Sequence, residues 1–306
     1  MSAKQDTSNN NNMMSSCASC GKAEGVGIQL RTCTACKSVR YCGVTCQRNH
    51  RPQHKKACKK RAAELRDEIL FRQPESTHNG DCPICCLPLP IDEAKFAYHA
   101  CCSKLVCLGC TVANMKRLQA ERLQNVCPFC RDVAQRSDAK QNMMKRIQAN
   151  DPIAMCEMGL MRCKEGNYEE ALNYYSKAAE LGNARAHYYY SILYREGQGV
   201  EKDEKKEVYH LEEASIGGHP EARLILAQYE EERGNHVRAV KHHIIAANLG
   251  LDLSLHSLRV FYTKGFVNKK DFAAALSAYQ AVADATKSPQ RDEAAKVCEA
   301  FLAGKK

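Results

Sequence analysis

The stretch YCGVTCQRNHRPQHKKACKKR, at positions 41–61, carries two signals that point to different classes of protein. Seven of its last fourteen residues are Lys or Arg, a density that is typical of arms that bind nucleic acid. The same stretch contains Cys42, Cys46, His54 and Cys58, whose side chains are of the types that bind zinc. The rest of the sequence decides which signal dominates.

The chain has 306 residues, enough for two or three domains, and 19 of them are Cys, most in two clusters before residue 131. Its polar start, MSAKQDTSNNNNMMSS, lacks the apolar core of a signal peptide, and no segment reaches the roughly eighteen apolar residues of a membrane span. We therefore expect an intracellular protein, in the cytoplasm or nucleus, where clustered Cys more often bind metal than form disulfides.

The first cysteine cluster consists of closely spaced pairs that continue upstream of the quoted stretch. A structural zinc needs four ligands in tetrahedral arrangement, and a gap of two residues lets one turn present two of them. Eight ligands predict two zinc ions. The eight are Cys17, Cys20, Cys33, Cys36, Cys42, Cys46, His54 and Cys58.

Residues 17–58 resemble a MYND-type zinc finger through the patterns CxxC, CxxC, YCxxxCQ and HKxxC. The resemblance implies two interleaved sites, with Cys17, Cys20, Cys42 and Cys46 on one zinc and Cys33, Cys36, His54 and Cys58 on the other. Arg51 stands where the family usually has a Trp that lines a peptide-binding groove, and the chain has no Trp. Peptide binding by this finger is therefore left open.

A second cluster lies in CPICC, HACCSKLVCLGC and CPFCR, between positions 82 and 131. Its spacing resembles an all-cysteine RING finger, here expected over residues 80–132, which again implies two zinc ions. The implied first site is Cys82, Cys85, Cys107 and Cys110, and the second is Cys101, Cys102, Cys127 and Cys130. His99 is the alternative to Cys101 as third ligand.

The RING resemblance also implies a surface for a ubiquitin-conjugating enzyme. RING fingers that act as ubiquitin ligases use an apolar residue in the first ligand pair, a central helix and a Pro in the last pair. Ile84 and Pro128 stand at these positions, and Arg131 follows the last ligand, where ligases often have an Arg that contacts the ubiquitin-loaded enzyme. The central helix is expected over residues 111–125, with Thr111 as its cap. The structural alternative is that Ile84 and Pro128 only shape the zinc-binding turns.

The metal sites also explain much of the positive charge. The formal charge of +10 treats every Cys as neutral. Zinc-bound Cys is a thiolate, so fifteen ligand thiolates and four Zn²⁺ together contribute −7, which leaves about +3. The basic run leads into a helix expected over residues 59–73, and no aromatic residue interleaves with the run to stack bases. The quoted stretch is thus interpreted as half of a zinc site followed by a basic helix, and nucleic acid is an unlikely partner.

Beyond residue 150 the sequence consists of paired helical segments. Gly182, Gly218 and Gly250 each close the second helix of a pair, as in an α-solenoid. Residues 184–218 resemble a Sel-one-like repeat, and the other pairs look more like tetratricopeptide repeats.

Three further expectations concern the helical half. Its final helix, in PQRDEAAKVCEAFLAG, is expected to cap the open end. Tyr188, Tyr189 and Tyr190 are successive helical residues about 100° apart, so at least one ring is expected to be available to a partner. Cys156, Cys163, His242 and His243 lack nearby partner ligands and are expected to be structural.

The predicted fold class is small zinc-stabilised α+β modules followed by an all-α helical-repeat solenoid. The expected order begins with a disordered polar tail (1–16), the first finger (17–58) and a helical linker (59–79). The second finger (80–132), a linker helix (133–150) and the solenoid with a capping helix (151–306) follow. No catalytic nucleophile motif is present. We expect a zinc-binding adaptor that binds protein partners through the repeats. Either it is also a RING-type ubiquitin ligase, or it is a non-catalytic scaffold.

Overall fold

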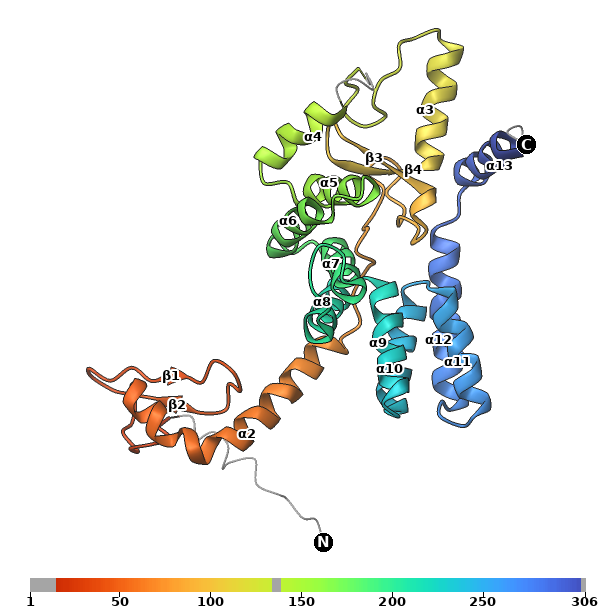
Figure 1. The fold of residues 1–306 in the computed structure, drawn as a ribbon. Coiled ribbons are helices and arrows are strands. Elements are labelled where there is room, and N and C mark those ends of the chain that lie inside the picture. Colours follow the sequence, from red (N-terminus) through yellow and green to blue (C-terminus); the bar gives the residue numbers. More distant parts are fainter. Residues whose placement is uncertain (1–14, 134–138, 304–306) are drawn as a thin grey trace. The chain divides into compact units, whose positions relative to one another are not determined.

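The computed structural model describes residues 15–133 and 139–303 (Figure 1). The chain divides into two compact units between Arg72 and Gln73, which are described separately. Most of the expected polar tail, residues 1–14, and the first part of the expected linker, residues 134–138, lie outside the described residues.

The first unit is a small finger followed by one long helix. Its elements are β1 (Arg31–Thr32), β2 (Arg40–Tyr41) and α2 (Val44–Leu70), and the two strands pair antiparallel. The helix that the sequence predicts from residue 59 begins earlier, at Val44, so that four of the residues on it are spaced by four. These are Cys46, His50, His54 and Cys58. The finger buries only Leu30 and Tyr41 besides its Cys side chains, too small an apolar core to fold alone.

The second unit begins with the second finger. Its elements are η1 (Glu93–Lys95), β3 (Phe96–His99), β4 (Lys104–Cys107) and α3 (Leu108–Ala120). The strands form a hairpin whose register runs from Phe96 opposite Cys107 to His99 opposite Lys104. Thr111 is not the cap of α3. The helix starts earlier because the Cys107 sulfur accepts the Cys110 N–H, and the Thr111 hydroxyl donates instead to the Cys107 carbonyl.

The helical half follows the predicted order of paired helices (Figure 1). The helices are α4 (Ala139–Gln148), α5 (Pro152–Lys164), α6 (Tyr168–Glu180), α7 (Ala184–Glu196), α8 (Glu204–Ile216), α9 (Pro220–Glu232), α10 (His236–Asn248), α11 (Asp252–Thr263), α12 (Lys269–Ala285) and α13 (Pro289–Ala303). Each helix from α5 to α12 packs on the next. Gly182, Gly218 and Gly250 close α6, α8 and α10 with φ of 82°, 85° and 96°, where glycine has no steric penalty. The predicted fold class is confirmed.

Asp and Asn side chains begin most of these helices. Asp151, Asn167, Asn183, Asp203 and Asn268 each accept a hydrogen bond from a backbone N–H in the first turn. Such caps contribute about 1 kcal/mol each, because they satisfy donors that the helix itself cannot. None of the described helices has the length and apolar character that a membrane span requires.

The second finger is fixed to the solenoid through a buried ion-pair network. The Arg185 side chain on α7 donates to Glu93 of η1 at 2.7 Å and pairs with Glu157 on α5. The Tyr189 hydroxyl also donates to Glu93, at 2.9 Å. Arg185 is 8% exposed, so its charge needs both carboxylates to remain inside the protein.

The segment that leads into the second finger lies against the ends of the solenoid helices. The His78 ring stacks on His219 with centroids 4.0 Å apart, and the backbone N–H of His78 donates to the Gly218 carbonyl. A side chain at Gly218 would collide with the Ser76 carbonyl, since an added Cβ would lie 2.7 Å from that oxygen. Gly218 therefore serves both the turn and the approach of this segment.

The last helix does not behave as the expected cap. Its main helix contact is α3 of the second finger, not α12. Lys116 and Glu293 form an ion pair at 2.5 Å between the two helices, and Ala294 is buried. On another helix, α4, Arg146 donates to the Cys101 carbonyl at 2.8 Å. Helices on both sides of the solenoid repeats therefore hold the finger.

We predict that Gly159→Ala destabilises the solenoid, although Ala favours a helix by about 1 kcal/mol over Gly. An added Cβ would lie 2.5 Å from the ring of Tyr175, which is 1% exposed, and overpacking typically costs about 1–3 kcal/mol. Urea denaturation of the zinc-loaded chain should show a lower midpoint. In a Tyr175→Leu background the same substitution should be neutral or stabilising, and a raised midpoint in the wild-type background would contradict the packing.

We predict that Glu93→Gln loosens the second finger from the solenoid. Burial alone would raise the pKa of Glu93, but the Arg185 hydrogen bond and charge outweigh it and hold the pKa below its usual value. This contribution is present above the unfolded pKa and is lost as pH falls through the folded one, so it is complete at pH of about 7. Because Glu93 is half-exposed, we expect a loss of about 1 kcal/mol, seen as faster hydrogen exchange in β3.

The matched control for this prediction is Glu121→Gln, which removes an exposed ion pair with Arg117 within the same finger. It should leave exchange in β3 at the wild-type rate, since surface pairs contribute little. Equal exchange in β3 for wild type and Glu93→Gln would show that the network does not hold the finger.

Candidate metal centres

Four turns of the two fingers share one backbone conformation. Each turn begins at a Cys whose backbone N–H donates to a carbonyl five or six residues later. The carbonyl of the same Cys accepts a hydrogen bond from the backbone N–H of the residue four positions later. The four accepting pairs are Gly21 to Cys17, Lys37 to Cys33, Cys86 to Cys82 and Arg131 to Cys127, at 2.8–3.0 Å. The residue at the fourth position has positive φ in every turn, between 55° and 74°. The turn explains why Cys86 stands beside a candidate ligand without being one.

In the first finger, the structure brings the predicted ligands together as two quartets. Cys17, Cys20, Cys42 and Cys46 form one, and Cys33, Cys36, His54 and Cys58 form the other, with all ligand atoms of a quartet within 4.8 Å of one another. α2 supplies one ligand to the first quartet and two to the second, so a single helix ties both together. Arg51 lies exposed on this helix.

The second finger also forms two quartets. Cys82, Cys85, Cys107 and Cys110 make up one, and Cys101, Cys102, Cys127 and Cys130 the other. Of the two candidates for the third ligand, Cys101 and His99, the structure places Cys101 in the quartet. Its sulfur lies 3.4 Å from that of Cys130. His99 is outside the quartet, and its carbonyl instead accepts the N–H groups of Cys102 and Ser103 in the hairpin turn.

The sulfur positions fit a tetrahedral zinc ion. Ligands about 2.3 Å from zinc at tetrahedral angles lie about 3.8 Å apart. The distances are 3.6 Å for Cys20–Cys42, 3.8 Å for Cys33–Cys58, 3.9 Å for Cys82–Cys110, 3.8 Å for Cys85–Cys107 and 3.8 Å for Cys102–Cys127. None of the described Cys is in a disulfide. Thiolate-rich quartets of this geometry suit zinc, the metal that the sequence predicts.

The hydrogen bonds of the shared turn also lower the pKa of its first Cys ligand. Burial acts to raise the pKa values of Cys17 and Cys33, but N–H groups of the same turn donate to the sulfurs and lower both pKa values to about 6. The same competition lowers the pKa of Cys127. The hydrogen bond from Cys107, followed by backbone N–H groups, lowers the pKa of Cys82 to about 4. Thiolate is the zinc-binding form, so these donors favour metal binding.

The residues that the sequence marks as a possible enzyme-docking surface lie at the ends of the second finger's two CxxC turns. Ile84 is 41% exposed, Pro128 is half-buried and Arg131 is exposed. Two apolar side chains that sequence reasoning did not select are also exposed, Met115 on α3 and Phe129. Phe129 could have been selected, because it stands beside Pro128 within the last ligand pair.

The residues expected to be structural are inside the solenoid. Cys156, His242 and His243 are each at most 1% exposed. The His243 Nε2 lies 2.8 Å from a Glu231 carboxylate oxygen, and burial lowers the pKa of His242 to about 3. None of them belongs to a metal-binding group among the described residues.

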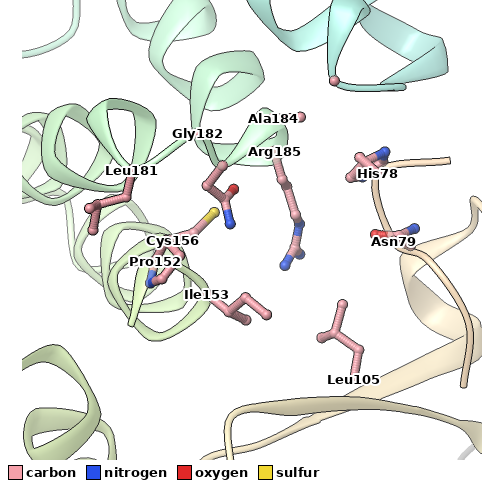
Figure 2. A pocket seen from close by; sticks show the side chains of 12 residues that line it. His78, Asn79, Leu105, Pro152, Ile153, Cys156, Leu181, Gly182, Ala184 and Arg185 are labelled. Atoms are coloured by element: carbon pink, nitrogen blue, oxygen red, sulfur yellow. The ribbon is translucent and has the colours of Figure 1, made fainter. Parts of the chain in front are cut away.

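A cavity of about 260 Å³ lies between the second finger and the solenoid. Figure 2 shows Arg185 extending into it from α7, with Asn79 and Leu105 on the finger side. The charge of Arg185 is already paired with Glu93 and Glu157. The cavity is thus a polar gap of the packed junction, and no sequence motif marks it, because its walls come from distant segments.

Comparison with known proteins supports the division into modules. Residues 17–58 match the family model of the MYND finger, and residues 152–183, 184–219 and 220–251 match that of the Sel1 repeat. The chain therefore contains a MYND finger and three Sel1 repeats, more than the one Sel-one-like repeat that the sequence indicates. A search of curated proteins finds no match.

Two solved structures are similar to the helical half. One is a Sel1 repeat protein from Oxalobacter formigenes, at 22% identity and a TM-score of 0.41, covering 57% of this chain and 70% of that one. The other is c5321, a protective antigen of uropathogenic Escherichia coli with an SLR fold, at 21% identity and a TM-score of 0.39, covering 53% of this chain and 36% of that one. The family matches, with the four quartets, make this chain a zinc-binding protein-interaction adaptor.

Proposed function

We propose that this adaptor recruits a ubiquitin-conjugating enzyme through its second finger while the helical repeats bind the protein to be modified. The observation that carries the proposal is a set of three exposed apolar side chains on the finger, Ile84, Met115 and Phe129. These side chains come from the first ligand pair, the central helix and the last ligand pair, the three places that the RING resemblance implies.

The positions of these exposed apolar side chains support the proposal. The finger contacts the helices of its unit through η1, α3, the backbone after Cys85 and the Cys101 carbonyl. Ile84 and Phe129 lie at 41% exposure outside those contacts. An apolar surface that stays exposed on a finger held elsewhere by the same chain is suited to an apolar partner.

Arg131 would act on the loaded enzyme. Its backbone is fixed by the hydrogen bond from its N–H to Cys127, and its side chain is exposed. In the proposed reaction a lysine amine attacks the thioester carbonyl, ubiquitin is transferred to that amine, and the enzyme's cysteine leaves as a thiol. Arg131 would donate hydrogen bonds that hold ubiquitin against the enzyme, so no covalent intermediate forms on this chain.

The second candidate function is a non-catalytic zinc-dependent scaffold. It is favoured by the shared turn, because the residue in the position of Arg131 is Gly21, Lys37 or Cys86 in the other three turns. Such variety shows that the turn does not require an Arg. The backbone conformation at Arg131 is therefore explained without any role in catalysis.

Protein partners of the solenoid must use surfaces that the second finger does not occupy. The three rings of Tyr188, Tyr189 and Tyr190 diverge as predicted, but each is half-buried and stacked on the chain's own side chains. The expectation that one is left for a partner is not supported. Exposed apolar side chains farther along the solenoid, including Val237 and Phe266, are better candidates.

We predict four zinc ions per chain, one for each quartet. Cys85→Ser should lose one ion in native mass spectrometry, because it removes a ligand. Cys86→Ser should keep all four, because Cys86 occupies the positive-φ position of the same turn. Two ions in the wild-type chain, or equal losses in the two variants, would contradict the assignment.

For the ligase, we predict that the zinc-loaded chain accelerates discharge of ubiquitin from a conjugating enzyme onto free lysine in single turnover. Ile84→Ala should weaken recruitment of the enzyme. Arg131→Ala should leave recruitment nearly unchanged and slow discharge by one to two decades, since charge-assisted donors contribute about 1.5–3 kcal/mol.

The controls are Ile69→Ala, a similarly exposed isoleucine on α2, and Arg122→Ala, an exposed arginine after α3. Both should discharge at the wild-type rate. No acceleration by the wild-type chain across a broad panel of enzymes would leave the scaffold. Equal rates for wild type and Arg131→Ala would keep the ligase and remove the role of Arg131.

A further inference from the structure

Arg291, in the first turn of α13, reaches the first CxxC turn of the second finger across 200 residues of sequence. Its guanidinium donates to the Pro88 carbonyl at 2.8 Å, to the Leu87 carbonyl at 3.2 Å and to the Cys85 sulfur at 3.6 Å. The Leu87 carbonyl is the one that accepts the Cys82 N–H. One cation therefore contacts a metal-ligating sulfur and the backbone that shapes the turn.

The fit between the two helices is close. An added Cβ on Gly109 would lie 3.0 Å from the backbone nitrogen of Arg291, so α13 begins directly against the segment between Cys107 and Cys110. The Thr286 carbonyl accepts another hydrogen bond from the guanidinium, at 2.8 Å, which further fixes the Arg291 side chain. Arg291 is therefore preorganised toward the sulfur and is not a loose surface side chain.

A cation beside a site with four thiolates stabilises it. Zn²⁺ with four Cys thiolates carries a net charge of −2, and this excess negative charge is stabilised by donors outside the ligand set. Among the described residues, Arg291 is the cationic side chain with a hydrogen bond to a sulfur of this quartet. Lys116, which also lies in the contact between α3 and α13, is instead paired with Glu293.

We propose that Arg291 is an outer-sphere residue of the zinc site formed by Cys82, Cys85, Cys107 and Cys110, so that the C-terminal helix completes this metal centre. The finger is then not an autonomous zinc module, because part of its metal site lies beyond the solenoid repeats. The inference rests on zinc binding by this quartet and is independent of the ligase.

The proposal has a reciprocal consequence. If docking of α13 strengthens zinc binding, zinc binding must strengthen docking of α13 by the same factor. Removing zinc should therefore release α13, while α5 to α7, whose buried cluster includes Met155 and Tyr175, should keep their protection.

The test compares zinc release from the full-length chain for wild type, Arg291→Met, Arg291→Lys and Arg259→Met. Release to a chromogenic chelator is followed in time, and the Cys85→Ser variant identifies the phase that belongs to this quartet. We expect Arg291→Met to release that ion about tenfold faster, as for other outer-sphere substitutions, with Arg291→Lys between it and wild type. Arg259 is exposed on α11, and its substitution should change nothing.

Two further measurements separate a metal role from simple loss of folding. Cobalt replaces zinc, and the thiolate-to-cobalt charge-transfer bands are recorded; Arg291→Met should shift the bands of one quartet, because a lost hydrogen bond alters the sulfur donor. Hydrogen exchange in α13 is compared with and without zinc in the wild-type chain. Wild-type release kinetics and unshifted cobalt bands in Arg291→Met would overturn the proposal, as would α13 protection that is indifferent to zinc. An absence of the phase assigned by Cys85→Ser would instead show that the quartet holds no zinc.

Discussion

The constraint on which both fingers depend is the electrostatics of three or four thiolates held within 4.8 Å of one another. Without a cation, such a group of like charges repels itself, and protonation is the only relief. A bound zinc ion removes this repulsion. Its binding free energy, on the order of 10–16 kcal/mol for a structural site, then becomes the main contribution to folding of the finger. The fingers can therefore be built from short strands and few apolar residues. The shared turn, with its N–H groups aimed at the first sulfur, is the local structure that this requirement imposes.

The second finger differs from the first in what surrounds it within its own unit. Arg185 is buried between carboxylates from η1 and α5, and its charge needs both partners to remain inside the protein. His78 and His219 stack at a second contact, and α13 lies on α3 at a third. Contacts this widely spaced fix orientation as well as position. A partner bound on the Ile84 and Phe129 surface would accordingly be held in a defined geometry relative to the repeats, as the proposed ligase requires.

Local chemistry was predictable from the sequence, and long-range packing was not. The sixteen quartet residues, the paired helices and the glycines closing α6, α8 and α10 follow from spacing and backbone preference, which act within a few residues. The start of α2 at Val44 was missed because its first turns carry metal ligands in place of an apolar stripe. The docking of α13 and the pairing of Glu93 with Arg185 were missed for a different reason. They join segments about 90 to 200 residues apart, and a single Arg or Glu carries no sequence signature of its partner.

The long reach of Arg291 also orders the assembly of the protein. A contact between Cys85 and Arg291 closes a loop of about 200 residues, and the entropy of that closure must be overcome by other interactions first. The repeats supply them, since each helix packs on the next and brings the chain's end back toward the finger step by step. The quartet of Cys82, Cys85, Cys107 and Cys110 can take up zinc before this happens, because all four ligands lie within 29 residues. It reaches its full affinity only after α13 has docked, so the strength of this metal centre depends on a completely folded solenoid.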